Sequence, residues 1–264
     1  IALPAAMATT CLTFLGTAAV LPGAGEDTAH FLVNGRLLID TGWSCPLRMQ
    51  QFGYDPMAVE TLFFTHCHHD HYLGLPGLLF FRAMRRRRGA VGPRLRLVGP
   101  PDDLPRVVEL ARALLQPERF PEVCDDYELV PLPPGESLEL DGFRLETIPA
   151  IHPVTASSFR LTDRASGVVI VGSGDTAPNP ALIALARDCD LLIHEASLPP
   201  EAEPGRAGHS RAEDAARIAA EAGARRLRLV HLTAGHAERS LAAARARFPA
   251  AALATEGETL LLER

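Results

Sequence analysis

The sequence lacks the paired cysteines of a cross-linked or zinc-ribbon protein. Its five cysteines are scattered and form no C-x-x-C pair: Cys11, Cys45, Cys67, Cys124 and Cys189. An odd set of this kind excludes a disulfide framework and a zinc ribbon as the basis of the fold. We therefore expect a protein of a reducing compartment, the cytoplasm.

Positive charge is also in short supply. The formal net charge is −6 at pH 7, which excludes a protein whose whole surface binds polyanions, because such binding rests on clustered basic side chains. One local basic cluster remains, the four arginines at residues 85–88. It either contacts phosphates or complements the C-terminal dipole of a helix.

Long apolar runs are missing as well. No segment approaches the roughly 18 uninterrupted apolar residues of a membrane-spanning helix, so no membrane contact is expected. Residues 1–21 are rather apolar but lack a basic start and are interrupted by Pro4, Thr9, Thr10 and Gly16, which makes a signal peptide a poor interpretation. We expect residues 1–6 to be a disordered tail or a cloning remnant.

What is present is the composition of an ordinary packed protein. The chain has 264 residues, of which 47% are hydrophobic and 22% charged, enough for one large α/β domain or two small ones. Strands are predicted at residues 11–15, 30–33, 36–39, 61–65, 94–98, 127–130, 143–148, 158–161, 168–171, 191–193 and 227–230. Helices are predicted at residues 75–88, 104–115, 181–186, 211–222 and 237–248.

The order of these segments predicts the fold class. Two strand-rich blocks, the second running from residue 127 to residue 171, are each followed by helices. This order favours two facing sheets with helices outside, a four-layer αββα sandwich. Asn34-Gly35 is typical of a two-residue hairpin turn. No linker marks a boundary, so we expect a single domain over residues 1–264.

A histidine cluster follows one of the predicted strands. Residues 66–71 read H-x-H-x-D-H, and alternate side chains of an extended segment project the same way, so His66 and His68 can converge on one cation. Asp70 and His71 then turn toward a second. Imidazole and carboxylate suit zinc, manganese or iron; the alternative is a solvated polar loop, which crowded imidazoles disfavour.

Four more polar residues stand where predicted strands end. They are His152, Asp175, His194 and His231. Each alone is better interpreted as an ordinary surface or core residue, but their repetition at strand ends indicates a common site.

These residues resemble the metallo-β-lactamase superfamily, most closely its ribonuclease Z-like members. The resemblance extends over nearly the whole chain. It comprises residues 14–17 (FLGT), 38–42 (LIDTG), 66–71 with 74–77 (GLPG), 99–100 (GP), 173–176 (SGDT), 194–196 (HEA), 208–210 (GHS) and 230–232 (VHL).

The resemblance implies two divalent metal ions, with zinc expected and manganese or iron as alternatives. One ion would be held by His66, His68 and His152. The other would be held by Asp70, His71 and His231, with Asp175 bridging. Asp40 would orient a ligand imidazole; its alternative is a turn residue before Gly42. His194, the remaining strand-end histidine, is expected to serve structure rather than the metal.

Three catalytic residues are implied: Asp70, Glu195 and His209. His209, aimed by Glu195, would stabilise a phosphoryl oxygen or protonate the leaving alkoxide. The pairing of His-Glu-Ala with Gly-His-Ser points to ribonuclease Z-like enzymes rather than lactamases, glyoxalases or lactonases. The alternative for His209 is a residue at the start of a helix that Ser210 caps.

The predicted activity is phosphodiester hydrolysis, in which a hydroxide held between two metals attacks phosphorus and His209 assists departure. The alternatives are another ester class on the same fold (an aryl sulfatase, lactonase or β-lactamase-like enzyme) and a module that binds metal or a partner without catalysis. Fold membership does not choose among them.

Departures from ribonuclease Z bear on the partners. Only 22 residues separate His152 from Asp175, which leaves no room for the arm that grips tRNA. Arg211 replaces the Thr of the usual His-Ser-Thr string, and Glu26 and Asp27 stand where a basic residue is common. RNA therefore remains open as a substrate while tRNA is disfavoured. The oligomeric state is left open by the sequence, with a homodimer as one expected form because dimers occur in similar enzymes.

Overall fold

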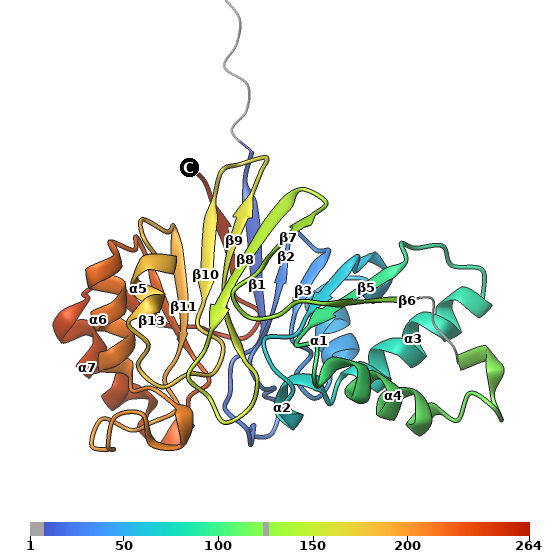
Figure 1. Cartoon of the computed structure of the whole chain (residues 1–264), viewed down its shortest axis with the longest axis horizontal. Helices are drawn as coiled ribbons and strands as arrows, with labels where there is room; N and C mark the ends of the chain where they lie inside the picture. Colours follow the sequence, from blue (N-terminus) through green and yellow to red (C-terminus); the bar gives the residue numbers. More distant parts are fainter. Residues whose placement is uncertain (1–7, 124–126) are drawn as a thin grey trace, which may run out of the picture.

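The computed structural model describes residues 8–123 and 127–264, and within these ranges the strands form two seven-stranded sheets that face each other (Figure 1). In spatial order the first sheet contains β14 (Thr259–Leu262), β1 (Thr10–Gly16), β2 (His30–Val33), β3 (Leu37–Ile39), β4 (Thr61–Phe63), β5 (Leu95–Gly99) and β6 (Tyr127–Pro131). The second contains β13 (Ala251–Leu253), β12 (Leu227–Val230), β11 (Leu191–Glu195), β10 (Val169–Gly172), β9 (Ser157–Asp163), β8 (Phe143–Pro149) and β7 (Ser137–Leu140).

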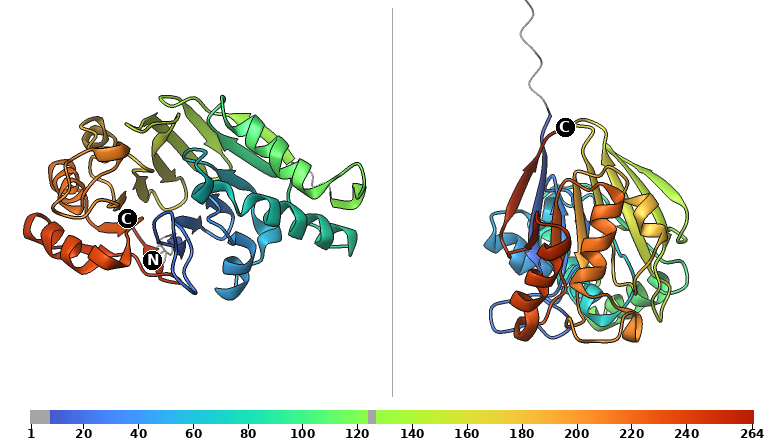
Figure 2. Two further views of the ribbon diagram at one scale, coloured as in Figure 1. Left: turned by 90° about the horizontal axis from the view of Figure 1, so that it is seen from below. Right: turned by 90° about the vertical axis from the view of Figure 1, so that its left-hand side faces the viewer.

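Helices cover the outer face of each sheet, as the views from below and from the side make clear (Figure 2). The first sheet carries α1 (Cys45–Gln51), α3 (Leu75–Arg87) and α4 (Leu104–Leu115), while the second carries α5 (Ala181–Leu185), α6 (Ala212–Ala222) and α7 (Ala237–Arg247). One further helix, α2 (His69–Tyr72), lies at the rim. The predicted four-layer αββα sandwich is confirmed.

Strand alternation explains why the layers hold together. In β2, Phe31 and Val33 join the core between the two sheets, whereas Leu32 joins the core beneath α1, α3 and α4. Successive side chains point to opposite faces, so a strand covered on both faces must be apolar throughout. Its four residues are all buried.

Most predicted elements are present within one or two residues, including the hairpin turn, where Asn34 and Gly35 have φ of 49° and 68°. The assignment of strands to sheets is wrong in one respect. β6 belongs to the first sheet rather than to the second run of strands, because it pairs in parallel with β5. The short elements α1, α2, β7, β13 and β14 were not predicted.

The topology gathers strand ends at one rim. β3 and β4 are parallel, and so are β10, β11 and β12, so their carboxyl ends point the same way, which is where ligands bind in α/β folds. The rim with α2 lies at the bottom of Figure 1. Among the described residues no helix has the length and hydrophobicity needed to cross a bilayer.

Candidate metal centre

Every residue predicted to hold a metal lies at this rim. His66 and His68 follow β4, and the single turn of α2 aims Asp70 and His71 inward. The other three come from the second sheet, after β8, β10 and β12: His152, Asp175 and His231. Segments far apart in the sequence thus meet in one cluster, although their role as metal ligands remains a proposal.

The donor atoms of the predicted ligands fall into two groups, each within 4.8 Å, and a third group of the same extent joins Glu195 and His209 to His231. His66, His68 and His152 form one group, in which His152 Nε2 is 3.0 Å from His68 Nδ1. Asp70, His71, Asp175 and His231 form the other. These are the two sets that the resemblance implied.

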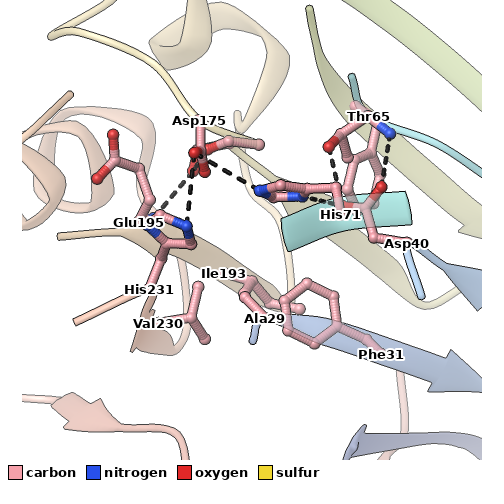
Figure 3. A pocket seen from close by; sticks show the side chains of 14 residues that line it. Ala29, Phe31, Asp40, Thr65, His71, Asp175, Ile193, Glu195, Val230 and His231 are labelled. Carbon is pink, nitrogen blue, oxygen red and sulfur yellow. Dashed lines mark hydrogen bonds and ion pairs between the residues drawn. The ribbon is translucent and has the colours of Figure 1, made fainter. Parts of the chain in front are cut away.

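Asp175 faces both His71 and His231 of the second group (Figure 3) and also approaches His66 of the first. Its Oδ2 atom is 3.8 Å from His66 Nε2, 3.6 Å from His71 Nε2 and 3.5 Å from His231 Nε2. The carboxylate therefore faces one imidazole of the first set and two of the second, as a bridging ligand would.

Four of the five predicted ligand imidazoles are fixed through the outward nitrogen. His71 Nδ1 donates to Asp40 Oδ2 at 2.9 Å, and His152 Nδ1 donates to the Gly208 carbonyl at 3.0 Å. The Nδ1 atoms of His66 and His231 contact hydroxyl oxygens of Thr65 and Ser197, at 3.1 and 2.7 Å. With Nδ1 engaged, the Nε2 atoms point into the cluster, the arrangement that metal-ligating histidines require.

Two buried atoms indicate that a cation fits here. Among the described residues, His66 Nε2 and His71 Nε2 are buried without a hydrogen-bond partner. An orphaned buried acceptor is costly, and two of them beside ionised carboxylates match the nitrogen and oxygen donors that zinc, manganese or iron binds.

The pKa shifts separate the two sets. Burial, together with neighbouring imidazoles, lowers the pKa values of His66, His68 and His152, so these rings are neutral and ready to ligate. Burial alone would also lower the pKa of His71, but the carboxylates of Asp40 and Asp175 raise it well above its ordinary value. This second set thus favours a positive charge, supplied by a proton or a metal ion.

The two carboxylates of the second donor group, Asp70 and Asp175, are both ionised. Burial opposes charge on Asp175, but His231 and His71 hold its pKa well below the usual range. For Asp70 too, the opposing effect of burial is outweighed, chiefly by the hydrogen bond from His231, and its pKa is lowered. His231 Nε2 lies 3.0 Å from Asp70 Oδ2.

His209 and Glu195 lie beside both sets. His209 Nδ1 donates to Glu195 Oε1 at 3.1 Å. Its ring centroid is 5.2 Å from that of His152 and 5.8 Å from that of His231. Burial would lower the pKa of His209, yet the hydrogen bond and charge of Glu195 raise it, so the imidazole stays protonated to a higher pH than usual.

The hypothesis that Ser210 caps a helix is wrong. Ser210 Oγ donates to the Thr176 carbonyl at 2.7 Å, and Ser210 N donates to Glu195 Oε1 at 3.0 Å. The residue before α6 is Arg211, whose backbone N–H bonds to Asp214. The Gly-His-Ser segment is therefore tied to Glu195 rather than to the helix.

Backbone conformation explains two features of the motifs. Gly208 has φ of +81°, and a Cβ there would lie 2.7 Å from Pro153 Cδ and 3.0 Å from His152 Nδ1, so only glycine permits this approach. Asp40 and His231, both at strand ends, also have positive φ, each 57°. Non-glycine residues rarely adopt this region, and such strain concentrates at functional sites.

Asp27 is not a surface acid. It is 1% exposed and accepts hydrogen bonds from Trp43 N, Ser44 N and Ser44 Oγ, at 2.8, 3.0 and 2.6 Å. It therefore fixes the loop before α1. Glu26 is exposed and bonds Gly23 N.

The arginine run is mostly occupied. Arg86 donates to the carbonyls of Gly92 and Pro93, Arg87 pairs with Glu122 at 3.4 Å, and Arg85 lies 3.8 Å from Asp55. These contacts favour the interpretation as a helix end over a phosphate-binding patch.

Two residues whose hydroxyls contact predicted ligand imidazoles were missed by sequence reasoning, Thr65 and Ser197. Each precedes or follows a recognised motif, but serine and threonine are too common for position alone to mark them. His194, expected to serve structure, belongs to neither donor group among the described residues; its ring is buried and Nδ1 bonds the Glu195 carbonyl at 2.7 Å.

Comparison with known proteins defines the class first: the β-lactamase superfamily domain matches residues 35–232, and the chain belongs to the metallo-β-lactamase superfamily. Within it, the chain is 30% identical to ribonuclease Z of Myxococcus xanthus, over 85% of this chain and 87% of that protein. It is also 30% identical to ribonuclease BN of Cronobacter sakazakii, over 94% and 99%.

Solved structures agree with the fold. YhfI of Bacillus subtilis, described as a metallo-β-lactamase fold protein, superposes with a TM-score of 0.82 at 26% identity, covering 97% of this chain and 100% of that one. The short form of human tRNase Z has a TM-score of 0.75 at 21% identity, covering 95% and 98%.

Proposed function

We propose that this chain is a dinuclear-metal-dependent hydrolase, a phosphodiesterase resembling ribonuclease Z but without the tRNA-gripping arm. The observation that carries the proposal is the Glu195–His209 pair beside two complete donor sets. The relatives named ribonuclease Z and ribonuclease BN support the same reaction class.

In this proposal the metal site has two occupants. His66, His68 and His152 would hold one divalent cation, Asp70, His71 and His231 would hold the other, and Asp175 would serve both. Such a pair lowers the pKa of a shared water and neutralises charge on the phosphoryl oxygens. Zinc is the expected metal, with manganese and iron as alternatives.

The protein side chains supply orientation and a proton. Asp40 fixes the His71 ring through a 2.9 Å hydrogen bond. His209, kept protonated by Glu195, donates a proton to the departing oxygen or stabilises charge on the phosphoryl group. Catalysis by Asp70 consists in presenting its ionised carboxylate to the second cation.

The proposed substrate is a phosphodiester. A tRNA is disfavoured, because the arm that grips tRNA has no place in this chain. Between His152 and Asp175 the chain forms only the β9–β10 hairpin. The alignment with ribonuclease BN runs over 305 positions, more than the 264 residues of this chain, so that relative carries residues with no counterpart here. RNA remains a candidate substrate.

A panel of substrates tests the proposal. Metal-loaded protein should cleave bis(p-nitrophenyl) phosphate, a cyclic nucleotide or an RNA with an unpaired 3′ tail. A lactone, a thioester and an aryl sulfate serve as the competing classes. Rapid cleavage of one of those, with no phosphodiester cleaved, would replace phosphodiesterase by another ester class on the same fold.

We also propose a homodimer. Trp43, Leu47, Leu73 and Phe80 are 44%, 66%, 43% and 46% exposed and line one groove beside α1 and α3, the kind of apolar surface that a partner covers. A second copy is the occupant we expect. Light scattering should give twice the chain mass for the wild type and a monomer for Leu47→Glu; a monomeric wild type would refute it.

A further inference from the structure

Two buried carboxylates each reach two imidazoles, one directly and one through a hydroxyl group. Asp40 contacts His71 directly and reaches His66 through Thr65. Glu195 contacts His209 directly and reaches His231 through Ser197.

The connection through the Ser197 hydroxyl has the same form as the connection through the Thr65 hydroxyl. Ser197 Oγ donates to Glu195 Oε2 at 2.7 Å and lies 2.7 Å from His231 Nδ1. Thr65 Oγ1 donates to Asp40 Oδ2 at 2.9 Å and lies 3.1 Å from His66 Nδ1. The two connections thus end on one histidine from each donor set, His66 and His231.

Proton counting fixes which ring nitrogen is free. An ionised carboxylate only accepts hydrogen bonds, so each hydroxyl donates its single proton to the carboxylate. The hydroxyl oxygen must then accept from the imidazole, which places a ring proton on Nδ1 and leaves Nε2 as the nitrogen that a metal ion can take, in His231 by replacing the proton donated to Asp70. For His66 and His231 this is the nitrogen that points into the cluster.

We propose that Thr65 and Ser197 are positioning residues for metal binding, one for each cation. Each hydroxyl sets the tautomer and rotation of one ligand imidazole and ties it to a carboxylate that holds a second functional histidine. The inference rests on the proposed dinuclear site, and it makes Glu195 serve the second metal as well as His209.

The backbone allows the hydroxyl to be tested alone. Thr65 N donates to Asp40 Oδ1 at 2.9 Å, and Ser197 N donates to Glu195 Oε2 at 2.8 Å. These anchors do not depend on the side chain. Thr65→Val and Ser197→Ala therefore remove the bridging oxygen while each carboxylate keeps its backbone donor.

The experiment is a zinc titration of metal-free protein against a competing chromophoric chelator, with no substrate present. Wild type should bind two ions. Loss of such an outer contact typically weakens metal binding about 10–100-fold, so Thr65→Val and Ser197→Ala should each weaken one ion by that factor, and the double variant both. Thr65→Ser and Ser197→Thr keep the hydroxyl and should bind within about threefold of wild type.

Matched controls separate positioning from general loss of a buried hydroxyl. Thr13 bonds Tyr54 and Thr259, and Ser166 bonds Thr10, both away from the donor sets. Thr13→Val and Ser166→Ala should leave zinc affinity unchanged. At saturating zinc the activity of Ser197→Ala should recover, because Glu195 still contacts His209.

Two results would overturn the inference. One is wild-type zinc affinity in both Thr65→Val and Ser197→Ala. The other is an equal loss in Ser197→Ala and Ser197→Thr, which would indicate packing rather than hydrogen bonding. If wild type itself binds no zinc, manganese or iron, the proposed function fails instead, and the titration distinguishes the two failures.

Discussion

Replacing His209 by alanine should separate proton donation from metal binding. The ring lies 5.2 Å and 5.8 Å from one histidine of each donor set and is not needed to complete either set. Loss of a general acid costs about 10²–10⁴-fold in rate, which is roughly 3–5 kcal/mol of transition-state stabilisation. Metal content should stay at the wild-type value.

The loss of rate in His209→Ala should depend on the leaving group of the substrate. An alkoxide leaving from a cyclic nucleotide or RNA needs a proton, so His209→Ala should show the full loss there. A p-nitrophenolate departs as a stable anion, and the loss on bis(p-nitrophenyl) phosphate should be at least tenfold smaller, about 1.4 kcal/mol less. Steady-state kcat/KM on both substrates measures the ratio.

A control and a refuting outcome complete the design. The His69 side chain is exposed and its ring packs beside that of Tyr72, outside both donor sets, so His69→Ala should behave as wild type. Unchanged cleavage of the alkyl substrate by His209→Ala, with metal still bound, would remove the main support for a ribonuclease Z-like mechanism.

Three further outcomes are expected. In the pH profile, activity should fall as pH rises through the raised pKa of His209. Glu195→Gln keeps the hydrogen-bond acceptor but removes the charge, so it should move that fall to lower pH. An unmoved profile would show that Glu195 does not set the pKa of His209. Gly208→Ala places a Cβ 3.0 Å from His152 Nδ1 and should reduce metal content measured by elemental analysis, whereas full occupancy would show that the loop yields. Chelation should lower the melting temperature, since an ion at a hundred times its Kd stabilises by about 2.7 kcal/mol; an unaltered melting temperature in calorimetry would argue against a resident metal.

The fold could be predicted where local pattern and burial agree. β2, α4 and β12 have the predicted bounds, because apolar periodicity there matches the buried face. α1 was missed since Pro46 looks like a break, although proline is well tolerated in the first turn of a helix.

Long-range pairing is what the sequence could not supply. β14 joins the first sheet by pairing Leu262 with Thr10 across the length of the chain, and no local signal encodes such a partner. β13 is three residues long and alanine-rich. The same limit placed β6 in the wrong sheet.

The site was more predictable than the fold's edges, because each donor residue follows a strand that ends at the same rim. Ser210 was given the wrong contact, and the burial of Asp27 was not predicted, for a common reason. A sequence gives their residue type but not the direction of the side chain, and both point into the protein to satisfy backbone groups.

The central claim is that two cations sit between the donor sets, and anomalous X-ray diffraction above and below the metal absorption edges tests it most directly. The account predicts two anomalous peaks, one among His66, His68 and His152 and one among Asp70, His71 and His231, with Asp175 touching both. Fully metallated protein with a single peak, or with its peaks outside these sets, would contradict it.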